Sequence, residues 1–243
     1  MAEEATPARN TARRDLLLDL QQRAQKKWED EKTFEVDAPE VGDDVEVEKF
    51  FGNFPYPYMN GLLHLGHAFS LSKLEFASAY HRLKGDQTLF PFAFHCTGMP
   101  IKACADKISN EIKKYGNPPK FPDAAELEAE AKAKAEAEAA NAGPVDPTKF
   151  VAKKSKATAK KGTQATQWGI MQASGIPDEE IPNFADSMHW LNYFPPLAKR
   201  DVMAMGCQVD WRRSFITTDA NPFYDAFVRW QFNTLKKIGK IVK

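Results

Sequence analysis

Hydrophobic and polar positions change their spacing along residues 50–94, and each change predicts a different element. An apolar run at 50–54 predicts a short buried strand, and two prolines and a glycine within 55–61 exclude regular structure there. Over 66–83 apolar residues recur at the period of a helix. A second apolar run at 88–94 predicts another strand, although it contains a proline. Strand, helix and strand in this order predict a right-handed βαβ unit with parallel strands.

Helical periodicity also dominates the flanking regions. The stretch 13–32 predicts an amphipathic helix that packs across the rest of the domain through one stripe, and 101–115 predicts a second helix. The stripe consists of Leu16, Leu17, Leu20, Ala24 and Trp28. Residues 123–140 are almost entirely alanine, glutamate and lysine, so we expect a solvated helical insertion.

The last part of the chain predicts several further helices. We expect them near 168–173, 184–193 and 197–205, with Pro195-Pro196 separating the last two. A loop leading into a strand follows at 209–218, and its Asp210-Trp211-Arg212 is interpreted as a structural cluster rather than a substrate contact. Asn221-Pro222 is typical of a helix start, and Gly239 ends that helix.

Composition narrows the class of protein. The 243 residues carry 33 Lys+Arg and 33 Asp+Glu, so no overall positive charge indicates a nucleic-acid surface. The three cysteines, Cys96, Cys104 and Cys207, lack paired metal-ligand spacing and are expected to be reduced thiols in the interior. Because no apolar run is long enough to cross a bilayer and no signal-peptide core is present, we expect a soluble, cytoplasmic protein.

Two histidines flank a glycine at the predicted strand-to-helix turn. His64, Gly66 and His67 fall where a helix N-terminus presents unpaired N–H groups and a partial positive charge, an arrangement that attracts phosphate. Two imidazoles there can stabilise charge that develops on an attacked phosphorus. A chance pair, or histidines that serve only the turn, is the structural alternative. The loop His95–Pro100 follows the next strand, so it should lie at the same sheet edge.

A family resemblance covers nearly the whole chain. His64-Leu-Gly-His67 resembles the His-Ile-Gly-His motif of class I aminoacyl-tRNA synthetases. The longer strings from Phe54 through Leu83, and from His95-Cys-Thr-Gly-Met-Pro to Lys107, resemble the cytosolic leucyl-tRNA synthetases of eukaryotes and archaea.

The resemblance implies an α/β fold, with an incomplete Rossmann-like parallel nucleotide-binding sheet, a helical insertion and an N-terminal helix. It divides the chain into an N-terminal extension and helix (1–45), the first βαβ unit of a class I catalytic domain (46–115), the insertion and linker (116–165), and a helical continuation (166–243). We expect the last segment to stop before an editing domain.

The resemblance also assigns roles to residues. ATP and leucine would react to leucyl-adenylate, and leucine would then be transferred to tRNA-Leu, with Mg²⁺ accompanying ATP. His64 and His67 would be catalytic and would bind ATP together with Gly66, whereas no residue is assigned to a protein-bound metal. The leucine pocket would consist of Phe54, Tyr56, Tyr58 and His95. For the three aromatic residues, packing at the end of a strand is the structural alternative.

Two other functions stay open at this point. A small nucleotidyltransferase with the same His-x-Gly-His turn would need a complete sheet within this length. A non-catalytic, leucine-binding regulatory protein would bind leucine without exchanging pyrophosphate. Because the second half of the sheet, the lysine-rich catalytic loop and the main tRNA contacts are expected elsewhere, we expect this chain alone not to aminoacylate tRNA.

Overall fold

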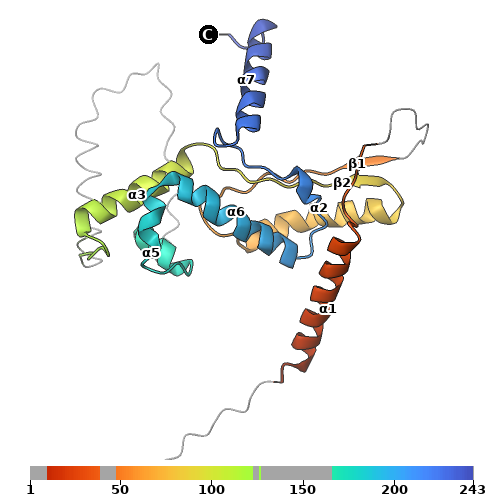
Figure 1. Ribbon diagram of the computed structural model, residues 1–243, viewed down its shortest axis with the longest axis horizontal. Coiled ribbons are helices and arrows are strands. Elements are labelled where there is room, and N and C mark those ends of the chain that lie inside the picture. Colours follow the sequence, from red (N-terminus) through yellow and green to blue (C-terminus); the bar gives the residue numbers. More distant parts are fainter. Residues whose placement is uncertain (1–9, 39–47, 123–125, 127–165, 243) are drawn as a thin grey trace, which may run out of the picture. The chain divides into compact units, whose positions relative to one another are not determined.

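The computed structural model describes residues 10–38, 48–122, 126 and 166–242 (Figure 1). The chain divides into two compact units. The first comprises Met1–Thr97 with Tyr193–Lys243, and the second comprises Gly98–Asn192. Most of the predicted Ala/Glu/Lys insertion lies outside the described residues, and the predicted domain limits at 45, 115 and 165 stay predictions.

A parallel βαβ unit forms the centre of the first unit. Strand β1 (Lys49–Phe51) leads through a turn into helix α2 (Leu65–Leu83), which is followed by strand β2 (Gln87–Leu89). The two strands lie side by side (Figure 1) and pair in parallel, with Phe50 opposite Thr88 in the register. This confirms the predicted α/β class and the parallel crossover, in the form of an open, partial Rossmann-like arrangement.

The regular strands are shorter than predicted. Strand β2 was expected to reach residue 94, but it ends before Pro91, which has no N–H to donate to a ladder. The chain beyond it is paired with a segment far away in sequence: Asp210 donates its N–H to the carbonyl of Phe90 (2.9 Å), and Phe94 donates to Phe215 (3.0 Å). The expectation of a buried first strand was also wrong in part, since Phe51 is 64% exposed.

Aromatic side chains fill the core on which these segments rest. Phe90, Phe92 and Phe94 are buried, and the ring of Phe54 stacks on Phe92 at a centroid distance of 5.9 Å. Each such ring removes a large apolar area from water, which stabilises the fold by about 1.5–3 kcal/mol per side chain. This core holds the carboxyl ends of the strands, and the loops that follow them, in place.

Helix α1 (Ala12–Asp30) packs less than predicted. Leu16 and Leu17 are 56% and 57% exposed, so the expectation that the whole apolar stripe packs across the domain is wrong. Its C-terminal half is anchored, since Gln21 and Gln25 donate to the carbonyls of Ala204 and Met203. These two hydrogen bonds are made by glutamine side chains, so they hold the helix without burying the leucines of the stripe.

Helix α6 (Ser187–Ala204) corrects the predicted break at Pro195-Pro196, because the helix runs through both prolines. Each proline removes one N–H donor from the helix, which ordinarily disfavours it. Trp190, Phe194, Ala198 and Val202 recur every four residues and are all buried. A continuous buried face therefore compensates for the missing donors. The predicted end near residue 205 is confirmed by Gly206, whose φ is +84°.

The second unit is helical. Helix α3 (Met99–Tyr115) packs against helix α5 (Gln167–Ala173) and a short 3-10 helix at Ile181–Ala185. The carboxylate of Glu111 in α3 accepts the N–H groups of Gln167 and Trp168 at 2.7 and 2.8 Å, which satisfies the first turn of α5.

Helix α7 (Pro222–Lys237) begins where the sequence predicts. The side chain of Asn221 accepts the N–H groups of Phe223 and Tyr224, and none of the residues of this helix is buried. Cys96 and Cys207 are buried thiols, as expected, whereas Cys104 was also expected in the interior and is only half-buried. Burial raises the pKa of Cys96 and Cys207 to about 12. Among the described helices, none combines the length and the apolarity that a membrane crossing requires.

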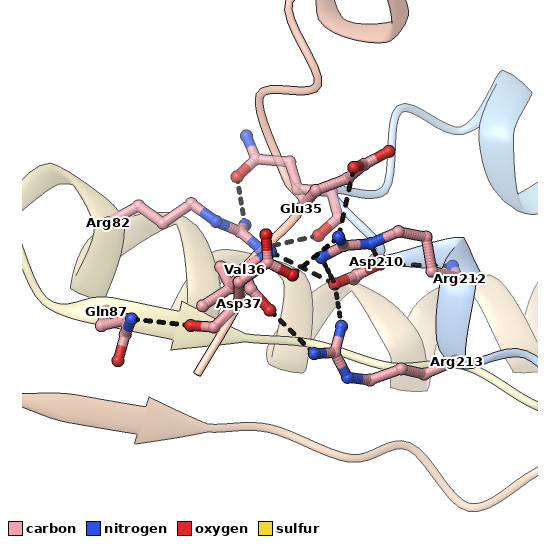
Figure 2. Close-up of polar contacts among 9 residues, drawn as sticks. Glu35, Val36, Asp37, Arg82, Gln87, Asp210, Arg212 and Arg213 are labelled. Atoms are coloured by element: carbon pink, nitrogen blue, oxygen red, sulfur yellow. Dashed lines mark hydrogen bonds and ion pairs between the residues drawn. The ribbon is translucent and has the colours of Figure 1, made fainter. Parts of the chain in front are cut away.

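The buried carboxylate of Asp210 is the centre of a polar cluster, the Asp210 cluster (Figure 2). Its exposed fraction is 0%. Arg212 donates through Nε and a terminal nitrogen at 2.9 and 2.8 Å, Arg213 donates to the same carboxylate, and the N–H of Val36 donates at 3.2 Å. Burial alone raises the pKa of Asp210, but these hydrogen bonds outweigh it and lower the pKa below its usual value.

The cluster joins three parts of the chain. Arg213 also donates to the carbonyl of Val36 at 2.8 Å, and Arg212 contacts the carboxylate of Asp37 at 2.9 Å. Gln87, in β2, donates to the carbonyl of Asp37 at 3.1 Å (Figure 2). The segment after α1, strand β2 and the segment 210–213 are thereby fixed to one another, which confirms the structural interpretation of Asp210-Trp211-Arg212.

Replacing Asp210 by asparagine should therefore destabilise the fold. Asp210→Asn keeps the size of the side chain and can still accept from Val36, but it removes the charge that two arginines neutralise. We expect the free energy of unfolding to fall by about 2–3 kcal/mol in urea titrations followed by circular dichroism.

Asp30→Asn is the matched control, because the Lys26–Asp30 pair lies on the exposed surface of α1. Exposed pairs of this kind contribute little to stability, so the urea midpoint should scarcely move. Equal effects of the two substitutions would contradict the central role of the Asp210 cluster.

Candidate functional site

His64 and His67 form a reciprocal cap at the start of α2. His64 is the N-cap residue in an extended conformation, and its Nδ1 accepts the N–H of Gly66 at 3.1 Å. The Nδ1 of His67 accepts the N–H of His64 at 3.2 Å, and the two ring centroids lie 4.0 Å apart. Two of the N–H groups at the helix start are thus satisfied by the histidines themselves.

The cap determines which ring nitrogen carries the proton. Because both Nδ1 atoms accept hydrogen bonds, each neutral ring holds its proton on Nε2. His64 is exposed and His67 is half-buried, so both rings reach solvent. The start of α2 consequently presents two Nε2–H donors beside the positive end of a helix, which suits an anionic oxygen.

Gly66 is needed for this arrangement of rings. A Cβ built at residue 66 would lie 2.9 Å from Cε1 and 3.0 Å from Nδ1 of His64. A side chain at that position would push the imidazole off the N–H that it caps. Glycine therefore allows the His64 ring to lie directly on the backbone.

A second cluster surrounds His95 in the loop after β2. The carbonyl and the N–H of His95 pair with Met59 and Pro57, respectively, at 3.0 and 2.9 Å. The ring of Tyr58 meets that of His95 edge-on at a centroid distance of 4.3 Å. The two loops that follow the parallel strands therefore meet at Tyr58 and His95, on the edge predicted for a ligand site.

The predicted aromatic residues differ in their surroundings. Phe54 is only 9% exposed and packs in the core, as its structural alternative proposed. Tyr56 is half-buried and meets Phe215 edge-on at 5.5 Å, whereas Tyr58 is 50% exposed. Tyr58 and His95 are thus the members of the predicted pocket that contact each other and retain open surface.

Thr217 belongs to this cluster, although sequence reasoning did not identify it as a site residue. Its buried hydroxyl lies 2.9 Å from Nδ1 of His95, 3.2 Å from the N–H of Cys96 and 2.9 Å from the hydroxyl of Thr97. Its own N–H donates to the carbonyl of Phe94 at 3.1 Å. The sequence predicts a strand within 209–218 that includes Thr217, but this prediction does not indicate that Thr217 lies beside His95.

A separate cavity of about 230 Å³ lies under the C-terminal half of α1. Its walls include Trp28, Phe34, Lys199 and Trp211, and none of the predicted site residues lines it. Among the described residues, no group of three or more histidine, cysteine, aspartate or glutamate side chains is placed to hold a metal.

The stability that the cap contributes should depend on pH through His67. Partial burial, and next the neighbouring His64, lower the pKa of His67 below the ordinary value of 6.5. Between the folded and the unfolded pKa the unfolded chain binds more protons, so the cap contributes stability above about pH 6.5 and loses it as the pH falls through the folded pKa. NMR titration should give a midpoint below 6.5 for the ring of His67 in the folded chain.

His64→Asn provides the control, since asparagine can cap a helix without a second imidazole nearby. The midpoint of His67 should rise in this variant. An unchanged midpoint would show that the neighbouring ring contributes nothing.

Comparison with known proteins shows which proteins this chain resembles in sequence. The family model described as "tRNA synthetases class I (I, L, M and V)" matches residues 23–138. The cytoplasmic leucine–tRNA ligase of Pongo abelii is 54% identical over 233 residues, which cover 96% of this chain and 19% of the relative. That of Arabidopsis thaliana is 53% identical over 243 residues, which cover 98% of this chain and 22% of the relative.

A solved ternary complex of an Agrobacterium radiobacter LeuRS with tRNA and LeuAMS covers 90% of this chain and 18% of that chain, with a TM-score of 0.47 and 15% identity. The chain spans about a fifth of the length of the curated relatives. On the sequence identity along nearly its whole length, the chain belongs to the class I aminoacyl-tRNA synthetases, in the family of cytoplasmic leucine–tRNA ligases.

Proposed function

We propose that this chain supplies the phosphate-binding turn and part of the leucine pocket of a leucine–tRNA ligase. The observation that carries the proposal is the reciprocal His64–His67 cap, which leaves two Nε2–H donors at a helix start. The loop of the same cap contains Tyr58, which contacts His95 in the loop after the next strand. Donors for a triphosphate thus lie on the same edge as an aromatic and polar surface for an amino acid.

In the proposed reaction a carboxylate oxygen of leucine attacks the α-phosphorus of ATP, and pyrophosphate leaves. The enzyme forms no covalent bond in this step, so its residues orient the reactants and stabilise charge. His64 and His67 would donate to phosphate oxygens from Nε2, where negative charge grows during the attack. Gly66 would act through the His64 ring, whose position depends on the missing Cβ, and would leave room for the nucleotide.

Mg²⁺ would accompany ATP and neutralise phosphate charge. The donors at the start of α2 fit phosphate oxygens rather than a metal, so the ion would be coordinated mainly by the nucleotide.

The leucine side would be formed by Tyr56, Tyr58 and His95. The half-open rings of the two tyrosines offer an apolar face to an isobutyl group, and their hydroxyls and His95 offer polar contacts. Phe54 would contribute only through the small part of its ring that is not packed against Phe92. A pocket of this kind separates side chains that differ by one methylene by only about 1–3 kcal/mol.

We further propose that leucine is transferred to tRNA-Leu in the cytoplasm, with the main tRNA contacts formed by regions outside this chain. The relatives are named cytoplasmic and are about five times as long as the matched segment. For the same reason, we expect the isolated 243 residues to bind ATP weakly and not to aminoacylate tRNA.

The test is a chimera in which this chain replaces the matched segment of the Arabidopsis thaliana relative. We expect the chimera to catalyse leucine-dependent exchange between ATP and pyrophosphate. His64→Asn should keep the cap but remove one Nε2–H donor, and should lower the exchange rate by about 100- to 1000-fold.

Ser70→Ala is the control, since Ser70 is an exposed residue of the same helix. It should leave exchange unchanged. A chimera that binds leucine but never exchanges pyrophosphate would favour the regulatory alternative. Exchange that is insensitive to His64→Asn would remove the role proposed for the cap.

A further inference from the structure

We propose that Thr217 is a positioning residue of the leucine pocket, whose hydroxyl holds His95 so that Nε2 can accept a hydrogen bond from the α-ammonium group of the substrate. The inference rests on the proposed function and adds to it the means of binding the ammonium group. Thr217 acts through His95 and is not itself placed in contact with the substrate.

The hydrogen bonds of Thr217 limit what His95 can do. A hydroxyl has one proton and two lone pairs. The N–H of Cys96 can only donate, so it occupies one lone pair of Thr217. One lone pair and one proton remain for two neighbours, Nδ1 of His95 and the hydroxyl of Thr97, both at 2.9 Å.

Two arrangements satisfy this count. In the first, Thr97 donates to Thr217 and Thr217 donates to Nδ1, so neutral His95 carries its proton on Nε2. In the second, Thr217 donates to Thr97 and receives the proton of Nδ1–H, so Nε2 of neutral His95 has a free lone pair. Thr97 is exposed and its hydroxyl can rotate, so either arrangement keeps Thr217 fully bonded.

A substrate ammonium group selects the second arrangement. The ammonium group carries only donors and needs an acceptor. In the first arrangement the Nε2–H of His95 would face an N–H of the ammonium group, and no hydrogen bond could form. Nδ1 is already bonded to Thr217, and Nε2 has no hydrogen-bond partner within the part of the chain that the structure describes. The half-buried ring of His95 contacts Tyr58, which is half exposed. The change moves the imidazole proton: Nε2 releases one proton to water and Nδ1 takes up one from water, so the net charge of the cluster is unchanged, while the two hydrogen bonds of the Thr217 hydroxyl reverse.

The hydroxyl is not required for the pairing of the segment around Ile216 with Phe94, which form an isolated parallel bridge. The backbone N–H of Thr217 already bonds to the carbonyl of Phe94, and Phe94 donates to Phe215. The segment would therefore remain beside residue 94 without the hydroxyl. What the hydroxyl adds is the orientation of the His95 ring and the choice of its tautomer.

The experiment compares two ligands on the full 243-residue chain by NMR. L-Leucine carries the α-ammonium group, and 4-methylpentanoate is the same molecule without it. We expect the wild-type chain to bind leucine more tightly than 4-methylpentanoate. When leucine is bound, the ¹⁵N chemical shifts of the His95 ring should report a proton on Nδ1. Thr217→Val should weaken the affinity for leucine by at least about tenfold and leave the affinity for 4-methylpentanoate unchanged.

Three further variants separate orientation from folding. Thr217→Ser keeps the hydroxyl and should restore leucine binding. Thr97→Val changes an exposed residue and removes the hydroxyl that accepts the Thr217 proton. It should also weaken the affinity for leucine and leave that for 4-methylpentanoate unchanged. Thr218→Val is the matched control, because its hydroxyl bonds to Asp219 and Ala220 and not to His95.

The outcomes distinguish the inference from the proposed function. If wild type binds neither ligand, the leucine pocket itself is wrong, and the inference is overturned with it. If wild type binds leucine but both Thr217→Val and Thr97→Val leave the preference for leucine unchanged, the role of Thr217 alone is overturned. Should Thr217→Val fail to fold, Thr97→Val decides by the same criterion.

Discussion

A carboxylate without access to water is stable only where fixed donors surround it, and the first unit is arranged around one such group, Asp210. Its partners come from the segment after α1 and from Arg212 and Arg213, and its own N–H is bonded to Phe90. The backbone after Asp210 therefore runs alongside the chain that extends from β2. Seven residues later this alignment brings Thr217 next to His95. The contacts of the Asp210 cluster thus determine which residue lies beside His95.

The candidate site has two parts with different physical origins. At the start of α2, His64, Gly66 and His67 are neighbours in sequence, and every bond of the cap spans at most three residues. Such an arrangement is encoded locally and was predictable from the sequence. The surroundings of His95 are encoded at long range, because Thr217 lies 122 residues away. A single sequence contains no local signal for such a pairing, so the residue was missed even though its strand was expected.

The same distinction explains which parts of the fold were predicted. The βαβ unit and the starts of α2, α3 and α7 follow from periodicity and capping residues, which act within a few positions. The break predicted at Pro195-Pro196 was wrong because the buried face of α6 outweighs two lost donors. The leucines of α1 were expected to be covered, but amphipathic spacing shows only that a face could be buried. It does not show which surface would cover it.

Because their origins differ, the two parts of the site should respond differently when the fold is weakened. The hydrogen bonds of the cap are made within residues 64–67 and depend on the neutral state of His67. Helix α2 is bonded to Gln208 only farther along, through Glu75 and Arg82. The hydroxyl of Thr217 reaches His95 only while the backbone from Asp210 onward stays paired with the chain after β2. Loosening the Asp210 cluster would therefore release the hydroxyl that contacts His95 while leaving the His64–His67 cap formed. The proposed contacts to phosphate and to the amino acid thus depend on separate interactions within one unit, and the proposed selectivity for the amino acid is the property that depends on long-range order.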